Sequence, residues 1–167
     1  MTLEELNALG ASAATRELLR CCGSRAWAAR MSAARPFASA EAMGASADGV
    51  WSELTEADWR EAFAAHPRIG ADGSGGSGGS RWSENEQSRV ATASAATLER
   101  LAAKNRDYHA RFGYIFIVCA TGKSADEMLA MLEQRLTNDP ETEIGIAAEQ
   151  QRQITRLRLD KLLKETR

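Results

Sequence analysis

Apolar residues along this chain recur mostly at intervals of three and four, the spacing that gathers them on one face of an α-helix. Polar residues that match or approach a capping box, in which two side chains satisfy the free amides of a first turn, precede four such stretches: Thr2 with Glu5, Thr55 with Asp58, Ser83 with Glu86, and Ser124 with Glu127. Ser12 and Ser24 are further candidate N-caps. The pattern therefore predicts helices in most of the chain.

Glycine and proline mark the predicted helix ends. One helix is expected to stop at Gly23, and the next near Arg35-Pro36, because proline cannot continue a helix. A later helix should close at His66, since the residue before Pro67 is disfavoured in the α region. His66 is therefore expected at a helix C-terminus.

The second half of the chain predicts longer elements. Residues 83–112 are rich in Ala, Glu, Arg and Leu and indicate one long helix or two in tandem, with a bend near Asn105 as an option. Residues 114–119 are the single strand-like stretch, and because one strand has no partner, we expect a buried extended connector. A helix over about 125–137 and a long final helix after Pro140 complete the prediction.

These elements predict an all-α fold: a single-domain bundle of about seven to nine helices with one short buried extended connector, over residues 1–167. The length of 167 residues and the 44% of hydrophobic residues suit one globular domain. Residues 73–80 contain only Gly and Ser and predict a flexible loop. Composition alone does not distinguish a native loop of this kind from an engineered one.

Charge and cysteine content limit the classes of binding partner and the cellular compartment that the sequence suggests. The formal net charge of -2, with Lys and Arg spread along the chain, argues against nucleic acid as a partner. Cys21, Cys22 and Cys119 are odd in number and lack C-x-x-C spacing, so we expect free thiols in a reducing compartment. The N-terminus lacks a signal-peptide pattern, and no apolar run approaches the roughly 20 residues that span a bilayer. We therefore expect a cytoplasmic protein without a membrane partner.

Several chemistries are disfavoured by what the sequence lacks. With His66 and His109 as its two histidines and no paired cysteines, the chain offers too few soft ligands for a zinc or iron site, and we expect no metal. Gly122-Lys123-Ser124 looks like the end of a phosphate-binding loop but has no glycine-rich cradle before it. A serine hydrolase would need a strand-turn-helix elbow of the G-x-S-x-G type, and the sequence predicts none.

Two stretches joined by the Gly/Ser loop carry candidate chemistry. His66-Pro67-Arg68-Ile69-Gly70 contains an imidazole that exchanges protons near neutral pH, although the same residues also suit a helix-ending turn in which His66 interacts with helix carbonyls. The stretch that begins at Ser83 places a carboxylate at Glu86, although it is also explained as a simple capping box. Both interpretations of each stretch stay open.

A third candidate is Arg158, which falls near the centre of an apolar stripe on the final helix. The stripe comprises Ile144, Ala147, Ala148, Gln151, Ile154, Thr155 and Leu162. A buried guanidinium needs a carboxylate or a polar ligand nearby, because an uncompensated buried charge costs several kcal/mol. An interhelical ion pair, or a side chain that extends to solvent from a less buried helix, would explain the pattern equally well.

Taken together, the motifs resemble those of the 2-oxo-4-hydroxy-4-carboxy-5-ureidoimidazoline (OHCU) decarboxylase family. The resemblance covers nearly the whole chain and rests on several separated motifs in one order. These are Cys21-Cys22-Gly23-Ser24 with Trp27, Met31 and Arg35-Pro36-Phe37, then His66-Pro67-Arg68-Ile69-Gly70, Ser83-x-x-Glu86-Gln87, Asn105-x-x-Tyr108-x-x-x-Phe112-Gly113, and Leu157-Arg158-Leu159.

The resemblance implies an all-helical, cofactor-independent, usually dimeric carboxy-lyase that converts the ureidoimidazoline product of urate oxidation into (S)-allantoin. It implies catalytic roles for His66 and Glu86. The substrate-binding positions that it implies are Pro67, Ser83, Gln87, Val118, Cys119, Ala120, Thr121 and Arg158.

The implied reaction suits these residue types. The carboxylate leaves a carbon next to a C=N bond, so the substrate takes up the electrons itself, and the resulting enol-like species must be protonated on one face. His66 is the expected acid, Glu86 the partner of His66 or of the substrate hydroxyl, and Arg158 a ligand for a substrate oxygen. Ser83 and the backbone near Val118 would orient the ureido arm, and the Gly/Ser loop would act as a lid if it closes.

Two other functions remain compatible with the same residues. One is a different enzyme of allantoin metabolism, such as a hydrolase that attacks the ring with water in the same ureido-recognising pocket. The other is a non-catalytic helical interaction module in which the candidate side chains serve only helix caps and ion pairs. Release of CO2 and the chirality of the product distinguish the first, and saturable binding of allantoin near His66 would disfavour the second.

Overall fold

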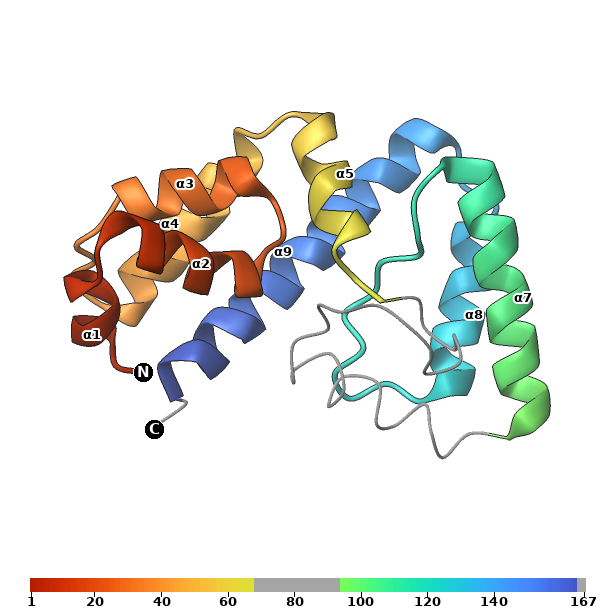
Figure 1. Cartoon of the computed structure of the whole chain (residues 1–167). Coiled ribbons are helices and arrows are strands. Elements are labelled where there is room, and N and C mark those ends of the chain that lie inside the picture. Colours follow the sequence, from red (N-terminus) through yellow and green to blue (C-terminus); the bar gives the residue numbers. More distant parts are fainter. Residues whose placement is uncertain (68–93, 165–167) are drawn as a thin grey trace. The chain divides into compact units, whose positions relative to one another are not determined.

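The computed structural model describes residues 1–67 and 94–164 (Figure 1). In these ranges it contains eight α-helices and no strand, which confirms the predicted all-α class and the predicted number of helices. The Gly/Ser stretch 73–80 and the helix start predicted at Ser83 lie outside the described residues. The chain divides into two compact units, Met1–Ala62 with the chain from Gln151 on, and Phe63–Gln150.

The first unit contains the N-terminal helices and the last turns of the final helix. Its elements are α1 (Leu3–Ala8), α2 (Ala11–Cys21), α3 (Arg25–Ala33), α4 (Ala40–Ser52), most of α5 (Glu56–Ala64) and the second part of α9 (Pro140–Lys164). Helix α3 packs against α2 and α4, and its Trp27 is fully buried and donates from Nε1 to the carbonyl of Ala47 in α4, 3.2 Å away. A buried indole N–H thus finds the partner that it needs.

Most of the helix-start predictions in this unit are confirmed. Thr2 forms a complete capping box with Glu5, and Ser24 accepts a hydrogen bond from the amide of Trp27 at 3.2 Å. The N-cap predicted at Ser12 is wrong, because α2 already begins at Ala11. Alanine is the strongest helix former, so the helix extends to that residue and the extended cap conformation falls on the preceding glycine.

The second unit contains α7 (Ala95–Phe112), α8 (Ala125–Arg135) and the first part of α9. Ser94 caps α7, and Ser124 forms the predicted capping box with Glu127. Helix α7 runs without interruption through Asn105, whose side chain donates to the carbonyl of Leu101 at 2.9 Å within the same helix. It ends at Gly113, which adopts φ 81°, a left-handed conformation that glycine enters without strain.

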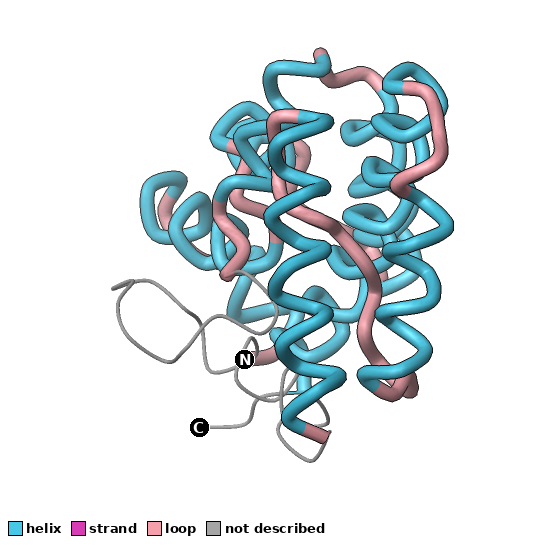
Figure 2. Tube along the Cα trace, turned by 90° about the vertical axis from the view of Figure 1, so that its right-hand side faces the viewer, coloured by secondary structure: helices cyan, strands magenta, loops and turns pink. Residues whose placement is uncertain are grey.

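The strand-like stretch is indeed an extended connector between α7 and α8. Tyr114 and residues 116–119 are buried, and no ladder pairing is present in the described part of the chain. Figures 1 and 2 show the connector running back along α7, so that α7 and α8 point in the same direction. Because the connector has no neighbouring strand, its buried backbone groups need other partners, such as side chains.

Aromatic rings form the centre of the second unit. Tyr108 of α7 lies 5.8 Å from Tyr114 and 5.5 Å from Phe116 between ring centroids, both in edge-to-face geometry. Phe63, at the end of α5, lies 5.2 Å from Tyr114. The end of α5 and the connector are therefore packed together within this unit. No described helix is long and apolar enough to cross a membrane.

Candidate active site

Helix α5 sets the position of His66. At its start Thr55 and Asp58 cap each other, with 3.1 Å from the Thr55 amide to Asp58 Oδ2 and 3.3 Å from the Asp58 amide to Thr55 Oγ1. The hydrogen bond to the Thr55 hydroxyl is the main cause that lowers the pKa of Asp58. The helix ends at Ala64, and the His66 amide still donates to the Phe63 carbonyl at 3.2 Å. The prediction that the helix closes at His66 is confirmed.

His66 is half-buried, and Pro67 after it is exposed. Because Phe63 is buried against Tyr114 of the connector, the imidazole is carried by a chain segment that is fixed one turn earlier. A partly exposed imidazole on a fixed backbone can exchange protons with solvent or with a ligand, which is the first requirement for a general acid.

The connector segment predicted to bind substrate is held by three side-chain contacts. The carbonyl of Ile117 accepts from Arg135 Nη1 at 2.5 Å. The Cys119 amide donates to Gln150 Oε1 at 2.8 Å, and the Cys119 carbonyl accepts from Lys123 Nζ at 2.8 Å. The segment is thus rigidly anchored on both sides of Val118, although it belongs to no regular element.

Three further amides of this segment donate to no residue that the structure describes. Within the described ranges, the backbone N–H groups of Val118, Ala120 and Thr121 donate no hydrogen bond to the protein. Val118 is buried, Ala120 is half-buried and Thr121 is exposed. Backbone N–H groups that a fold holds in place without pairing are suitable donors to carbonyl or carboxylate oxygens of a ligand.

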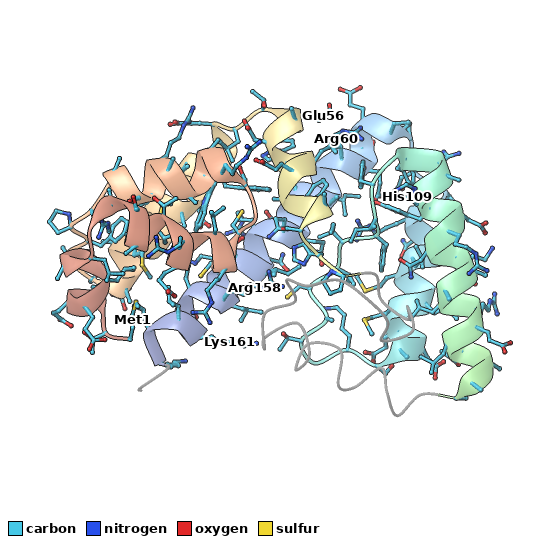
Figure 3. All side chains as sticks on the ribbon, viewed as in Figure 1. Met1, Glu56, Arg60, His109, Arg158 and Lys161 are labelled. Atoms are coloured by element: carbon cyan, nitrogen blue, oxygen red, sulfur yellow. The ribbon has the colours of Figure 1, made fainter. Side chains whose placement is uncertain are left out.

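Arg158 lies in the first unit, on the buried face of α9 (Figure 3). It is only 6% exposed, which argues against the interpretation that its side chain extends to solvent. The predicted stripe is confirmed apart from Ile144, which is half-buried; its buried members are Ala147, Ala148, Gln151, Ile154, Thr155 and Leu162.

Two buried thiols lie within the electrostatic reach of Arg158. Burial raises the pKa of Cys21 and of Cys22, that of Cys22 to about 11, while the charge of Arg158 lowers both values by a smaller amount. A hydrogen bond with the Thr155 side chain also lowers the pKa of Cys22. All three cysteines of the chain are free and buried, as predicted for thiols in a reducing environment.

The structure describes some of the predicted site residues, and others lie outside the described ranges. His66, Pro67 and the connector residues Val118 to Thr121 belong to the second unit, and Arg158 belongs to the first. Ser83, Glu86 and Gln87 lie outside the described residues, as do Arg68, Ile69 and Gly70. The convergence of imidazole, carboxylate and guanidinium on one pocket therefore stays a prediction.

One polar cluster was missed by the sequence analysis. Arg135, Glu143 and Tyr108 form a buried network in the second unit, with 2.7 Å from Arg135 Nε to Glu143 Oε1. The signal was present in the sequence, because Arg135 continues the apolar face of α8, three residues after Leu132. It is the same signal that drew attention to Arg158.

The described residues contain no group of three or more His, Cys, Asp or Glu side chains arranged to hold a metal ion. The titratable groups that stand out are instead the half-buried imidazole, the buried arginines and their hydrogen-bond partners.

Sequence and structure comparisons place this architecture among known proteins. The family description OHCU decarboxylase matches residues 7–160. The chain is 43% identical over 148 residues to the uric acid degradation bifunctional protein TTL of Arabidopsis thaliana, covering 87% of this chain and 46% of that protein. It is 31% identical over 138 residues to the 2-oxo-4-hydroxy-4-carboxy-5-ureidoimidazoline decarboxylase of Amia calva, covering 81% and 79%.

Solved structures agree with these relatives. An OHCU decarboxylase crystallised in the presence of (S)-allantoin superimposes with a TM-score of 0.79 at 39% identity, over 89% of this chain and 98% of that chain. An (S)-allantoin synthase matches in fold with a TM-score of 0.74 at 19% identity, over 98% of this chain and 54% of that one.

The helical fold and the family match assign the chain to a family whose description is that of decarboxylases, which are lyases. The chain belongs to the OHCU decarboxylase family, as its motifs suggested. It spans about half the length of the Arabidopsis relative and most of the length of the Amia relative.

Proposed function

We propose that this chain catalyses the cofactor-independent decarboxylation of 2-oxo-4-hydroxy-4-carboxy-5-ureidoimidazoline to (S)-allantoin in urate catabolism. The observation that carries the proposal is the family match over residues 7–160, together with the likeness to an OHCU decarboxylase structure over 98% of that chain. The half-buried His66 at the fixed end of α5 supports it, as does the anchored connector, whose Val118, Ala120 and Thr121 amides donate to no described residue.

In the proposed reaction the C–C bond to the carboxylate breaks and its electron pair moves into the adjacent C=N bond of the ring. CO2 leaves, and an enol-like species remains that must accept a proton on one face. His66 donates that proton, and Glu86 holds His66 or the substrate hydroxyl in position. The position of His66 on a backbone that Phe63 anchors against Tyr114 supports a single direction of proton delivery.

Substrate binding is assigned to the remaining predicted residues. Arg158 pairs with an oxygen of the ligand, since a guanidinium offers a planar set of donors. The connector amides bind the ureido arm, and the buried side chains of Ile117 and Val118 keep water away from it. Pro67, Ser83, Gln87, Cys119, Ala120 and Thr121 complete the proposed set of substrate-binding positions.

The state of the protein in the cell is part of the proposal. Residues 1–167 are proposed to form one decarboxylase-like helical domain, which the match to a single family over residues 7–160 supports. A homodimer in the cytoplasm is proposed from the family resemblance and from the three free thiols. Light scattering and cell fractionation test these two points, and a monomer or a secreted protein would contradict them.

The decisive experiment follows the chirality of allantoin by circular dichroism after the purified chain is added to freshly generated substrate. His66→Asn should remain folded and lose most of the acceleration and the excess of the (S) enantiomer, since general acids contribute about 100-fold or more. His109→Asn is the matched control, because His109 is the other histidine of the chain and is exposed on α7 (Figure 3).

Formation of (S)-allantoin by His66→Asn at the wild-type rate would rule out the assigned role. A ring-opened product without CO2 would favour the hydrolase, and the absence of both turnover and allantoin binding would favour the interaction module.

A further inference from the structure

The connector between α7 and α8 is anchored by side chains at alternate peptide groups. Arg135 Nη1 binds the carbonyl of Ile117, and Lys123 Nζ binds the carbonyl of Cys119, at 2.5 and 2.8 Å. Each peptide group is a rigid plane in which the carbonyl of one residue and the N–H of the next point in opposite directions. The two side chains therefore fix the directions of the Val118 and Ala120 N–H groups.

Both N–H groups are among the connector amides that have no acceptor in the described ranges, as is that of Thr121. The amide between them, that of Cys119, points to the other side and is bound by Gln150 at 2.8 Å. In the described ranges, Val118 and Ala120 donate to no protein group. The connector thus presents two N–H donors that point to the same side. The carbonyl of each of these peptide groups is bound on the opposite side by a cationic side chain.

The arginine is itself held firmly. Its Nε and Nη2 bind Glu143 Oε1 at 2.7 and 2.6 Å, and the Tyr108 hydroxyl donates to the same oxygen. Asn138 Nδ2 donates to the second oxygen of Glu143 at 2.9 Å. Arg135 is 5% exposed and Glu143 is fully buried, so the ion pair is desolvated and its geometry is closely defined.

A purely structural ion pair would require only the contact with Glu143. The third donor of the guanidinium instead goes to a main-chain carbonyl of the connector, and its face lies over the Phe116 ring at 4.6 Å from the centroid. Arg135 therefore contacts both the Phe116 ring and the peptide group between Ile117 and Val118.

We propose that Arg135 and Lys123 are positioning residues that orient the Val118 and Ala120 N–H groups toward the carbonyl oxygens of a bound ureido compound. The inference rests on the proposed function and deepens it, because it names the groups that set the ligand-binding geometry. Neither side chain touches the ligand. Both act through the carbonyl on the opposite edge of the peptide plane.

Lys123 offers the cleaner variant because its bond to Cys119 is only partly buried. Lys123→Met should keep the melting temperature near that of the wild type, raise the KM for substrate by about tenfold and leave kcat little changed, as expected when one donor to the ligand is misaligned. Lys123→Arg should restore much of the affinity. Lys104→Met is the matched control, since Lys104 is a lysine of the same unit that pairs with Asp107 within α7.

Arg135→Lys retains a positive charge beside Glu143 but lacks the guanidinium group that also donates to the Ile117 carbonyl. We expect a similar rise in KM, accompanied by a lower melting temperature. Tyr108→Phe is its control, because it removes a hydroxyl from the same buried network and leaves the bond to the Ile117 carbonyl in place. Tyr108→Phe should lower the melting temperature and leave KM unchanged.

A direct measurement uses (S)-allantoin as the probe in ¹⁵N-labelled protein. The amide resonances of Val118 and Ala120 should move on titration in the wild type, and the Ala120 shift should be lost in Lys123→Met. An active wild-type enzyme whose KM and amide shifts are unchanged by Lys123→Met and Arg135→Lys overturns this inference alone. A wild-type chain without decarboxylase activity overturns the proposed function and this inference with it.

Discussion

At the scale of single residues, buried charge is the most informative feature of the molecule. Arg135 and Arg158 both interrupt apolar stripes, and both are buried to the same extent, at 5% and 6% exposure. Arg135 is neutralised by Glu143 within its own unit. Arg158 lies near two neutral thiols, and the proposed role assigns it a ligand oxygen. Helical spacing identifies such residues, but it does not say which groups each of them contacts.

The pKa of Cys22 predicts how stability depends on alkaline pH. Burial raises that pKa from its ordinary 9.0 to about 11 in the folded protein, so the unfolded chain loses the proton first as the pH rises. The contribution of the neutral thiol to stability is complete below pH 9 and is lost as the pH approaches 11. The free energy of unfolding, measured in urea at several pH values, should fall across this window.

Cys22→Ala should reduce the slope of that decline. Leu18→Ala is the control, because it removes a buried side chain from α2, whose C-cap is Cys22, without removing a titratable group. It should lower the whole curve by about 2–5 kcal/mol and leave the slope as it is. An unchanged slope in Cys22→Ala would show that the titration arises elsewhere.

At the scale of elements, caps and turns were the most predictable parts of the fold. The boxes at Thr2 and Ser124 formed as expected, since they depend on residues three positions apart. The connector was predicted as buried and extended from the absence of a strand partner. How it is held was not predictable, because Arg135 and Gln150 reach it from positions far along the chain.

The turn after the connector offers a test of backbone strain. Gly122 adopts φ 80°, and a Cβ added there would meet no atom within 4 Å. Gly122→Ala should therefore destabilise the protein by about 1–2 kcal/mol through conformation alone. Gly145, which is helical in α9 and equally open, is the matched control. Gly145→Ala should stabilise the protein by about 0.5–1 kcal/mol.

Both stability changes can be checked by comparing urea midpoints under the same conditions. Equal effects of the two substitutions would contradict the assignment of strain to Gly122.

At the scale of the whole molecule, the proposed active site draws on distant stretches of sequence. His66 and the connector lie in one compact unit, Arg158 in the other, and Glu86 outside the described residues. The family match runs across all of these stretches, from residue 7 to residue 160. The proposed site therefore requires the chain to bring together groups that no local pattern connects.

A double-mutant cycle tests this requirement. Arg158→Ala should mainly raise KM, and Glu86→Ala should mainly lower kcat. If the two residues act on one bound substrate, the loss of kcat/KM in the double variant should differ from the sum of the single losses by about 1 kcal/mol or more. Strictly additive and minor losses would indicate separate structural roles for both residues.

The sequence by itself determined the helical class, most helix boundaries, the buried connector and the family, because these depend on periodicity, on caps within one turn and on ordered motifs. It also placed His66 at a helix end, since Pro67 stops the helix locally. Only the tertiary structure decided which polar groups are paired: the bonds of Arg135 to Glu143 and Ile117, and of Gln150 to Cys119, join separate elements. Such pairings depend on how elements pack in space, which no spacing along the chain specifies.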